Sequence, residues 1–259
     1  MIKLGIGVMT NRPDKFKRFM QSTKHLSSFK IKIGVHVTPP AKITDFDLCG
    51  IDVIDYGEHF TDGIFNCCDA RKASLRLVYD CDVILWADDD FQFKPHEDKY
   101  VNYALSSDDA IRQGTKMLLE NESIGFINMA SFLGGANYQR RFSVTKTINY
   151  ETAKGILTRP DVINTFDFSY PGVGEDIGFC TNALFNGYAG LKLFNVMTVK
   201  DKSKKIGHTD DPVYLPETAE RYLQKFMVER FGIRYKLGGK LPAKCLTGIN
   251  KIKSLDLNF

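Results

Sequence analysis

Three features that would assign the chain to a class at once are missing from its sequence. No uncharged apolar stretch is long enough to span a bilayer, which excludes a membrane-spanning helix. The six cysteines include no CxxC pair, so the sequence indicates neither a zinc site nor a disulfide framework. The first residues show no cleavage-site pattern of the kind that follows a signal peptide. These absences predict a protein of the reducing cytoplasm.

The sequence also has no internal repeat, no low-complexity linker and no large excess of one charge. Its formal net charge of +4 permits an anionic partner without requiring one. A length of 259 residues, 43% of them hydrophobic and 25% charged, suits one sizeable α/β domain of an ordinary globular protein. We expect this domain to cover residues 1–232. A basic tail, residues 233–259, is expected to pack on the domain or extend from it.

Strand-like and helix-like segments alternate along the chain. Apolar runs bounded by turn residues predict strands, and apolar positions at helical spacing predict helices. The predicted strands cover residues 3–9, 31–37, 51–56, 81–87, 124–130 and 191–197, with a strand pair at 139–150. The predicted helices cover residues 13–25, 62–79, 107–120, 176–186 and 216–231. This alternation indicates an α/β protein with a mostly parallel, Rossmann-like central sheet flanked by helices.

Three consecutive aspartates, Asp88, Asp89 and Asp90, follow a strongly apolar predicted strand. Adjacent like charges repel, and the end of a buried strand is an unfavourable place for them. Ligands of open α/β sheets bind at the carboxyl ends of the strands, and in an extended chain Asp88 and Asp90 point the same way. Two carboxylates on one side suit Mg²⁺ or Mn²⁺, which would offset the repulsion. A solvated turn is the alternative, but the flanking aromatic residues favour the metal site.

The segment VILWADDDFQF, residues 83–93, resembles the Asp-x-Asp motif of glycosyltransferases of the GT-A fold. Four other segments resemble motifs of that family, in the family's order. GVMTNRPDKF (7–16) resembles the first strand and loop, which hold the nucleotide, and DGIFNCCDARKAS (62–74) resembles the helix whose arginine approaches the diphosphate. GVGEDIGFC (172–180) resembles the acidic start of the acceptor-side helix, and KIGHTDDP (205–212) resembles the segment that often supplies an imidazole metal ligand. The resemblance covers most of the chain up to residue 232.

The resemblance implies a role for each matching residue. Asp90 and His208 would hold Mn²⁺ or Mg²⁺, and Asp88 would contact the same ion or the ribose of the nucleotide. Asp176 would be the catalytic base of an inverting reaction, with Glu175 as the alternative base. The donor, a nucleotide-diphospho-sugar with UDP as the first choice, would be contacted by Thr10, Asn11, Arg12, Arg71, Asp88 and Asp89. The resemblance also implies a smaller, acceptor-side sheet beside the central one.

Each motif also has an ordinary structural explanation. Pro13 after Asn11 and Arg12 suits the start of any helix, and Arg71 could simply lie on the solvent face of its helix. Two acidic residues at positions 175 and 176 would favour a helix N-terminus electrostatically. The functional interpretation depends on all the motifs occurring together and in order.

We therefore expect a metal-dependent glycosyltransferase, with a retaining mechanism still open. The lysine-rich tail suggests an anionic acceptor, and our first choice is DNA with hydroxymethylated bases, as phage-type transferases modify, which would place the protein in a host cytoplasm. Saccharide and protein acceptors stay open. A sugar-nucleotide nucleotidyltransferase is a second class, but its glycine-rich phosphate loop is replaced here by VMTNRPD. A non-catalytic nucleotide-binding module is a third, and it would not need Asp90 or Asp176.

Overall fold

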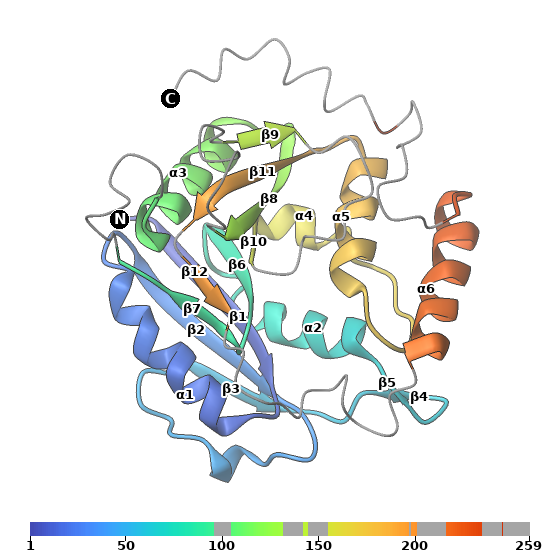
Figure 1. Ribbon diagram of the computed structural model, residues 1–259, viewed down its shortest axis with the longest axis horizontal. Helices are drawn as coiled ribbons and strands as arrows, with labels where there is room; N and C mark the ends of the chain where they lie inside the picture. The colour runs from blue at the N-terminus through green and yellow to red at the C-terminus, as the bar shows by residue number, and fades with distance from the viewer. Residues whose placement is uncertain are drawn as a thin grey trace.

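The computed structural model describes residues 1–95, 105–131, 142–144, 155–196, 198–200, 216–234 and 245 (Figure 1). A central sheet runs through the molecule in the strand order β3-β2-β1-β6-β10-β8-β11-β9. Its strands are β1 (Lys3–Thr10), β2 (Lys30–Val37), β3 (Val53–Tyr56), β6 (Val83–Asp88), β8 (Ile124–Ser131), β9 (Phe142–Val144), β10 (Ile156–Thr158) and β11 (Ala189–Val196). Two small antiparallel pairs accompany it, β4 (Phe60–Thr61) with β5 (Ile64–Phe65) and β7 (Phe91–Phe93) with β12 (Thr198–Lys200).

The central sheet is mostly parallel, as the sequence predicts. Strand β1 pairs in parallel with both β2 and β6, β2 pairs in parallel with β3, and β8 pairs in parallel with β11. Strand β10 runs antiparallel to both of its neighbours, β6 and β8, and β9 runs antiparallel to β11. The remaining parallel strands therefore all present their carboxyl ends at one edge of the sheet.

Helices cover both faces of this sheet (Figure 1). They are α1 (Pro13–Ser22), α2 (Cys67–Arg76), α3 (Ser107–Glu120), α4 (Pro160–Ile163), α5 (Glu175–Phe185) and α6 (Pro216–Phe231). Apolar side chains of α1 and α3 share one buried cluster with alternate residues of the strands, and those of α2, α5 and α6 share another. Because both faces are covered, strands such as β6 are buried along nearly their whole length.

Glycines on the central strands let α2 approach the sheet closely. A Cβ added to Gly34 of β2 would lie 2.6 Å from the Cβ of Leu77, at the end of α2. A Cβ added to Gly7 of β1 would lie 3.0 Å from the carbonyl oxygen of Ser74. Larger residues at these positions would push α2 outward. The glycines therefore determine how close the side chains of α2 come to the sheet.

Most predicted elements are confirmed, and the differences have local causes. The helices at 107–120 and 216–231 have the predicted bounds. The predicted helix at 62–79 is wrong at its start, because residues 60–65 form the β4–β5 hairpin. The helix begins only after Asn66, whose side-chain oxygen accepts a hydrogen bond from the backbone N–H of Asp69. Of the predicted strand pair at 139–150, the described residues include β9 alone.

Two further expectations from composition can be compared with the described residues. All six cysteines are free, five of them buried and Cys49 exposed, which agrees with the expected absence of a disulfide framework. Within the described part of the chain, no helix is both long and apolar enough to cross a membrane.

Arg159, which follows β10, holds the C-terminal end of α3 against the sheet. Its guanidinium donates hydrogen bonds to the carbonyl oxygens of Leu118 (3.0 Å), Glu122 (3.0 Å) and Ile124 (2.7 Å). Arg159→Met should lower the free energy of unfolding by about 2 kcal/mol, because it removes charged donors from the partly buried carbonyls of Leu118 and Ile124. Urea unfolding would measure the loss. Arg112→Met, at an exposed position of α3, is the control, and equal losses in the two variants would refute this role.

Candidate functional site

The aspartates lie at the carboxyl edge of the sheet, where the sequence predicts them. Asp88 is the last residue of β6 and is paired with Met9 of β1, one residue before the end of that strand. The chain turns at Asp89 and Asp90 before β7. The expectation that Asp88 and Asp90 alternate with Asp89 along an extended chain is therefore wrong, because the three residues do not lie in one strand.

Asp89 is held by the last residue of β1 and by a residue just after that strand. Its side chain is 2% exposed, and it accepts hydrogen bonds from the Thr10 hydroxyl (2.6 Å) and from Arg12 Nε (2.9 Å). The Arg12 Nη2 atom also forms an ion pair with Asp89. Arg12 thus neutralises one of the three adjacent carboxylates without a metal. This ion pair offsets part of the repulsion among the three aspartates.

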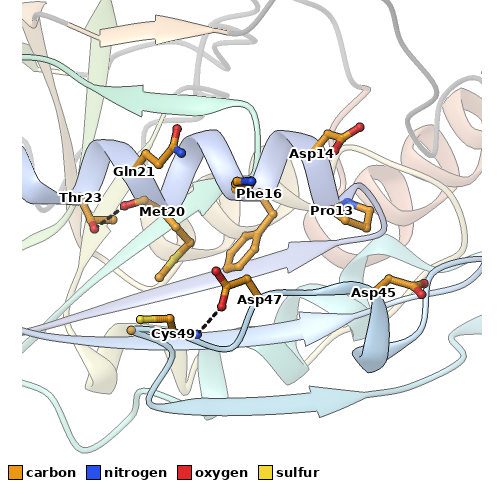
Figure 2. Close-up of a pocket in the computed structure, with 11 residues that line it drawn as sticks. Pro13, Asp14, Phe16, Met20, Gln21, Thr23, Asp45, Asp47 and Cys49 are labelled. Carbon is orange, nitrogen blue, oxygen red and sulfur yellow. Dashed lines mark hydrogen bonds between the residues drawn. The ribbon is translucent and has the colours of Figure 1, made fainter.

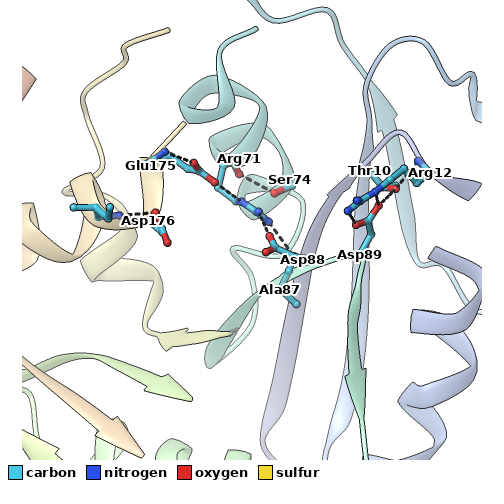
Figure 3. A network of polar contacts seen from close by, with 11 residues as sticks. Thr10, Arg12, Arg71, Ser74, Ala87, Asp88, Asp89, Glu175 and Asp176 are labelled. Atoms are coloured by element: carbon cyan, nitrogen blue, oxygen red, sulfur yellow. Dashed lines mark hydrogen bonds and ion pairs between the residues drawn. The ribbon is translucent and has the colours of Figure 1, made fainter. Parts of the chain in front are cut away.

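Asp88 turns to the other side, toward α2. Figure 3 shows Asp88 beside Arg71, and Asp89 beside Thr10 and Arg12. The Arg71 guanidinium donates through Nη2 to Asp88 Oδ1 (2.6 Å) and through Nη1 to the carbonyl oxygen of Ala87 (2.9 Å). The side chain of Asp88 is 32% exposed and is the most accessible of the three aspartates.

The two remaining predicted donor and metal residues of this edge are Asn11 and Asp90. Asp90 is buried, in the turn that leads to β7. Asn11 is half-buried, and its amide donates to the carbonyl oxygen of Pro39, after β2. The structure thus brings the ends of β1, β2 and β6 together with the aspartates. His208, the predicted imidazole ligand, lies outside the described residues.

Glu175 and Asp176 begin α5, and Glu175 approaches Arg71 of the same network (Figure 3). The preceding Gly174 has a φ of 93°, a left-handed conformation that favours glycine, and its N–H donates to Glu175 Oε2. Glu175 Oε1 lies 3.8 Å from Arg71 Nε. Asp176 is half-buried, and its Oδ1 accepts a hydrogen bond of 2.8 Å from the N–H of Ile177.

Glu175 has an unusual protonation equilibrium. Burial, and next the negative charge of Asp176, raise the pKa of Glu175 to about 7, although Arg71 acts in the opposite direction. Near neutral pH its carboxyl group is therefore partly protonated. Two adjacent acids with one buried and one half-exposed carboxyl group are suited to different roles.

Two contacts of Arg71 were not predicted from the sequence. The ring of Trp86 lies 4.9 Å from Arg71 Cζ, and the carbonyl oxygen of Ala87 accepts from the same guanidinium. Both belong to β6, immediately before the aspartates. The sequence holds one signal for this arrangement, because Trp86 is its single tryptophan and lies two residues before the first aspartate.

A separate pocket of about 530 Å³ lies beside α1 (Figure 2). It is lined by residues of α1 and of the connection between β2 and β3, including Phe16, Met20, Asp45 and Asp47. Its lining residues include none of the predicted site residues. We therefore place the candidate functional site at the carboxyl edge of the sheet.

Comparison with known proteins gives structural likeness without detectable sequence kinship. No family model matches the sequence, and no curated protein matches it. One similar solved structure is glucosyl-3-phosphoglycerate synthase from Mycobacterium tuberculosis in complex with Mn²⁺, UDP and glucosyl-3-phosphoglycerate. Its TM-score is 0.57 and its identity 13%, over 91% of this chain and 82% of that chain.

Two other similar structures contain nucleotide-sugars. The mannosyltransferase from Pyrobaculum calidifontis, in complex with GDP-Man and Mn²⁺, has a TM-score of 0.56 and 12% identity over 97% of this chain and 68% of that chain. TarS from S. aureus, in complex with UDP-GlcNAc, has a TM-score of 0.53 and 13% identity over 91% of this chain and 68% of that chain. These likenesses confirm the predicted GT-A fold.

Proposed function

We propose that this chain of GT-A fold is a metal-dependent glycosyltransferase, which moves a sugar from a nucleotide-diphospho-sugar to an acceptor hydroxyl. The observation that carries the proposal is the single line of polar contacts at the carboxyl edge, from Asp88 through Arg71 to Glu175 at the start of α5 (Figure 3). It joins the predicted donor side to the predicted acceptor side. The bound nucleotides and Mn²⁺ in two of the similar structures support this assignment.

The residues of the edge fit a hard divalent cation. Within the described residues no three His, Cys, Asp or Glu side chains gather into a metal cage. Mg²⁺ and Mn²⁺ do not need one, because one or two carboxylates with substrate phosphates and water complete their shell. Asp90 and Asp88 would hold the ion, with His208 as a further ligand. The bound ion would supply positive charge to the departing diphosphate.

The donor nucleotide would lie across the ends of β1 and β6. Asn11 and Arg12, together with the buried Thr10, would form the donor side of this position, and Asp89 fixes Thr10 and Arg12 by hydrogen bonds and an ion pair. Asp89 would therefore hold residues 10–12 in the conformation that contacts the donor. UDP is the proposed nucleotide, because uridine nucleotides occur in two of the three similar structures described above.

Asp176 is the proposed base, because its half-exposed carboxylate is more accessible to an acceptor than the buried Glu175. It would take the proton of the acceptor hydroxyl while the hydroxyl oxygen attacks the anomeric carbon. The bond from that carbon to the diphosphate oxygen breaks, and its electron pair leaves with the nucleotide. Attack opposite the leaving group inverts the anomeric centre.

The acceptor proposed first is DNA with hydroxymethylated bases, supported by the lysine-rich sequence of residues 233–259. Binding of such DNA should weaken steeply with salt, since phosphate contacts release counterions. Transfer of labelled sugar to hydroxymethylated DNA, with unmodified DNA as control, tests this choice. Transfer to a saccharide, protein or small phosphorylated acceptor alone would overturn it and leave the transferase assignment intact.

Thermal unfolding tests the donor site directly. UDP and Mn²⁺ together, at about 100 times the dissociation constant, should add about 2.7 kcal/mol of stability, or roughly 5–10 °C in Tm. Asp90→Asn should abolish this shift, because a carboxylate that would hold the ion is lost. Asp14→Asn, at an exposed position of α1, is the matched control and should keep it.

The competing classes give different results in the same set of assays. An unchanged Tm with every nucleotide diphosphate and Mn²⁺ would refute the glycosyltransferase assignment. A nucleotidyltransferase would release pyrophosphate when given a nucleoside triphosphate and a sugar phosphate. A binding module would show the Tm shift but transfer no sugar.

A further inference from the structure

Arg71 is in the predicted place and in an unexpected environment. It is 0% exposed and is among the largest fully buried side chains of the described residues. The family resemblance implies that this arginine contacts the donor diphosphate. A guanidinium with no exposed surface cannot reach a ligand outside the protein unless the site rearranges, so its direct partners are the protein groups around it.

Those groups hold the guanidinium from several sides. The Trp86 ring lies 4.9 Å from Cζ, while the carbonyl of Ala87 and the carboxylate of Asp88 accept from Nη1 and Nη2. Nε lacks a hydrogen-bond partner, and Glu175 Oε1 is 3.8 Å away. The Arg71 guanidinium is therefore hydrogen-bonded to Asp88, on the proposed donor side. It is in weaker ionic contact with Glu175, on the proposed acceptor side.

The fork of this guanidinium fixes a side chain relative to its own strand. One arm binds the backbone of β6 at Ala87 and the other binds the side chain of the next residue, Asp88. A carboxylate that is held in this way keeps one rotamer and one oxygen turned inward. Lysine has a single ammonium group and cannot reproduce two hydrogen bonds in a fixed plane.

We propose that Arg71 is a positioning residue, which contacts neither donor nor acceptor and acts by orienting the Asp88 carboxylate toward the metal–nucleotide complex. This inference rests on the proposed function, because it assigns to Asp88 a contact with that complex. If the inference holds, Arg71 does not contact the diphosphate, and α2 instead holds Asp88 in place from inside the protein.

A double-mutant cycle on ligand affinity tests the inference. The affinity for Mn²⁺ in the presence of UDP would be measured by calorimetry for the wild type, Arg71→Lys, Asp88→Asn and the double variant. Arg71→Lys should weaken binding roughly 10-fold or more, as loss of a group that orients a metal ligand does. In the Asp88→Asn background the same change should have less than about a 2-fold effect, because the side chain that it orients is already altered.

Two further variants separate positioning from general damage. Arg76→Lys, the same replacement at an exposed position of the same helix, should leave the affinity unchanged. Trp86→Phe removes the indole beside the guanidinium and keeps an aromatic core. It should weaken binding a few-fold, again only when Asp88 is present. All variants would be measured below their own unfolding temperatures. If Arg71→Lys does not fold, Trp86→Phe tests the inference in its place.

The outcomes are distinct. If the losses from Arg71→Lys and Asp88→Asn multiply, Arg71 acts on the ligand independently and the inference is overturned while the proposed function stands. If Arg71→Lys lowers the Tm but not the affinity, Arg71 is only structural, and the inference is again overturned. If the wild-type protein binds no metal–nucleotide complex, the proposed function fails and the inference fails with it.

Discussion

Asp176→Asn should lower kcat by about 10²–10⁴-fold and leave the affinity for the donor nucleotide nearly unchanged. The half-exposed carboxylate at the start of α5 is the group that we propose to remove the acceptor proton. Asparagine keeps the size and can accept the same hydrogen bond from the N–H of Ile177, but it cannot take a proton near neutral pH. Steady-state kinetics with saturating donor, together with the Tm shift by UDP and Mn²⁺, would measure both effects.

Glu175→Gln is the internal comparison for this experiment. Because Glu175 is buried, its replacement should reduce kcat much less than the Asp176 replacement. If Glu175→Gln causes the larger loss, the two roles are reversed and Glu175 is the base. Equal and small losses would mean that neither carboxylate removes the proton in the rate-limiting step.

The wild-type protein should lose about 3 kcal/mol of stability, relative to Glu175→Gln, as the pH rises from about 4.5 to above 7. The pKa of Glu175 is about 7 in the folded chain, compared with an ordinary value of 4.5. Between these values the folded chain keeps a proton that the unfolded chain has released. Raising the pH therefore favours unfolding, until both states are ionised and the difference is constant.

Urea unfolding of the wild type and Glu175→Gln at pH 5 and pH 8 would measure most of this difference. Glutamine is neutral at both pH values, so the common pH dependence of all other groups cancels in the comparison. Glu120→Gln, at an exposed position of α3, is the control and should follow the wild type. A difference between wild type and Glu175→Gln that does not change with pH would show that Glu175 ionises normally.

The fold and the edge that carries the site follow from the sequence for a simple physical reason. Apolar runs and helical spacing identify strands and helices, and parallel strands must place their carboxyl ends together. The aspartates after β6 and the polar residues after β1 therefore had to meet. The short β10 was missed, because three residues are too few for a periodic pattern.

The directions of the charged side chains were beyond sequence reasoning. The aspartates separate because the chain turns at Asp89 and Asp90 and enters β7, whose pairing partner, β12, lies far along the chain. The burial of Arg71 depends on how closely α2 approaches the sheet. That distance is governed by Gly7 and Gly34 on two different strands, whose contacts with α2 are long-range.

Strand β10 has a mechanical consequence for the whole molecule. Among the described residues, β10 is the only strand of the central sheet that joins β3, β2, β1 and β6 to β8, β11 and β9, and it is three residues long. If one half of the sheet tilted against the other, the change in strand pairing would be concentrated at β10 and its contacts with β6 and β8. Because Arg71 of α2 lies near Glu175 of α5 across the same division, such a tilt would directly alter the separation between these two side chains.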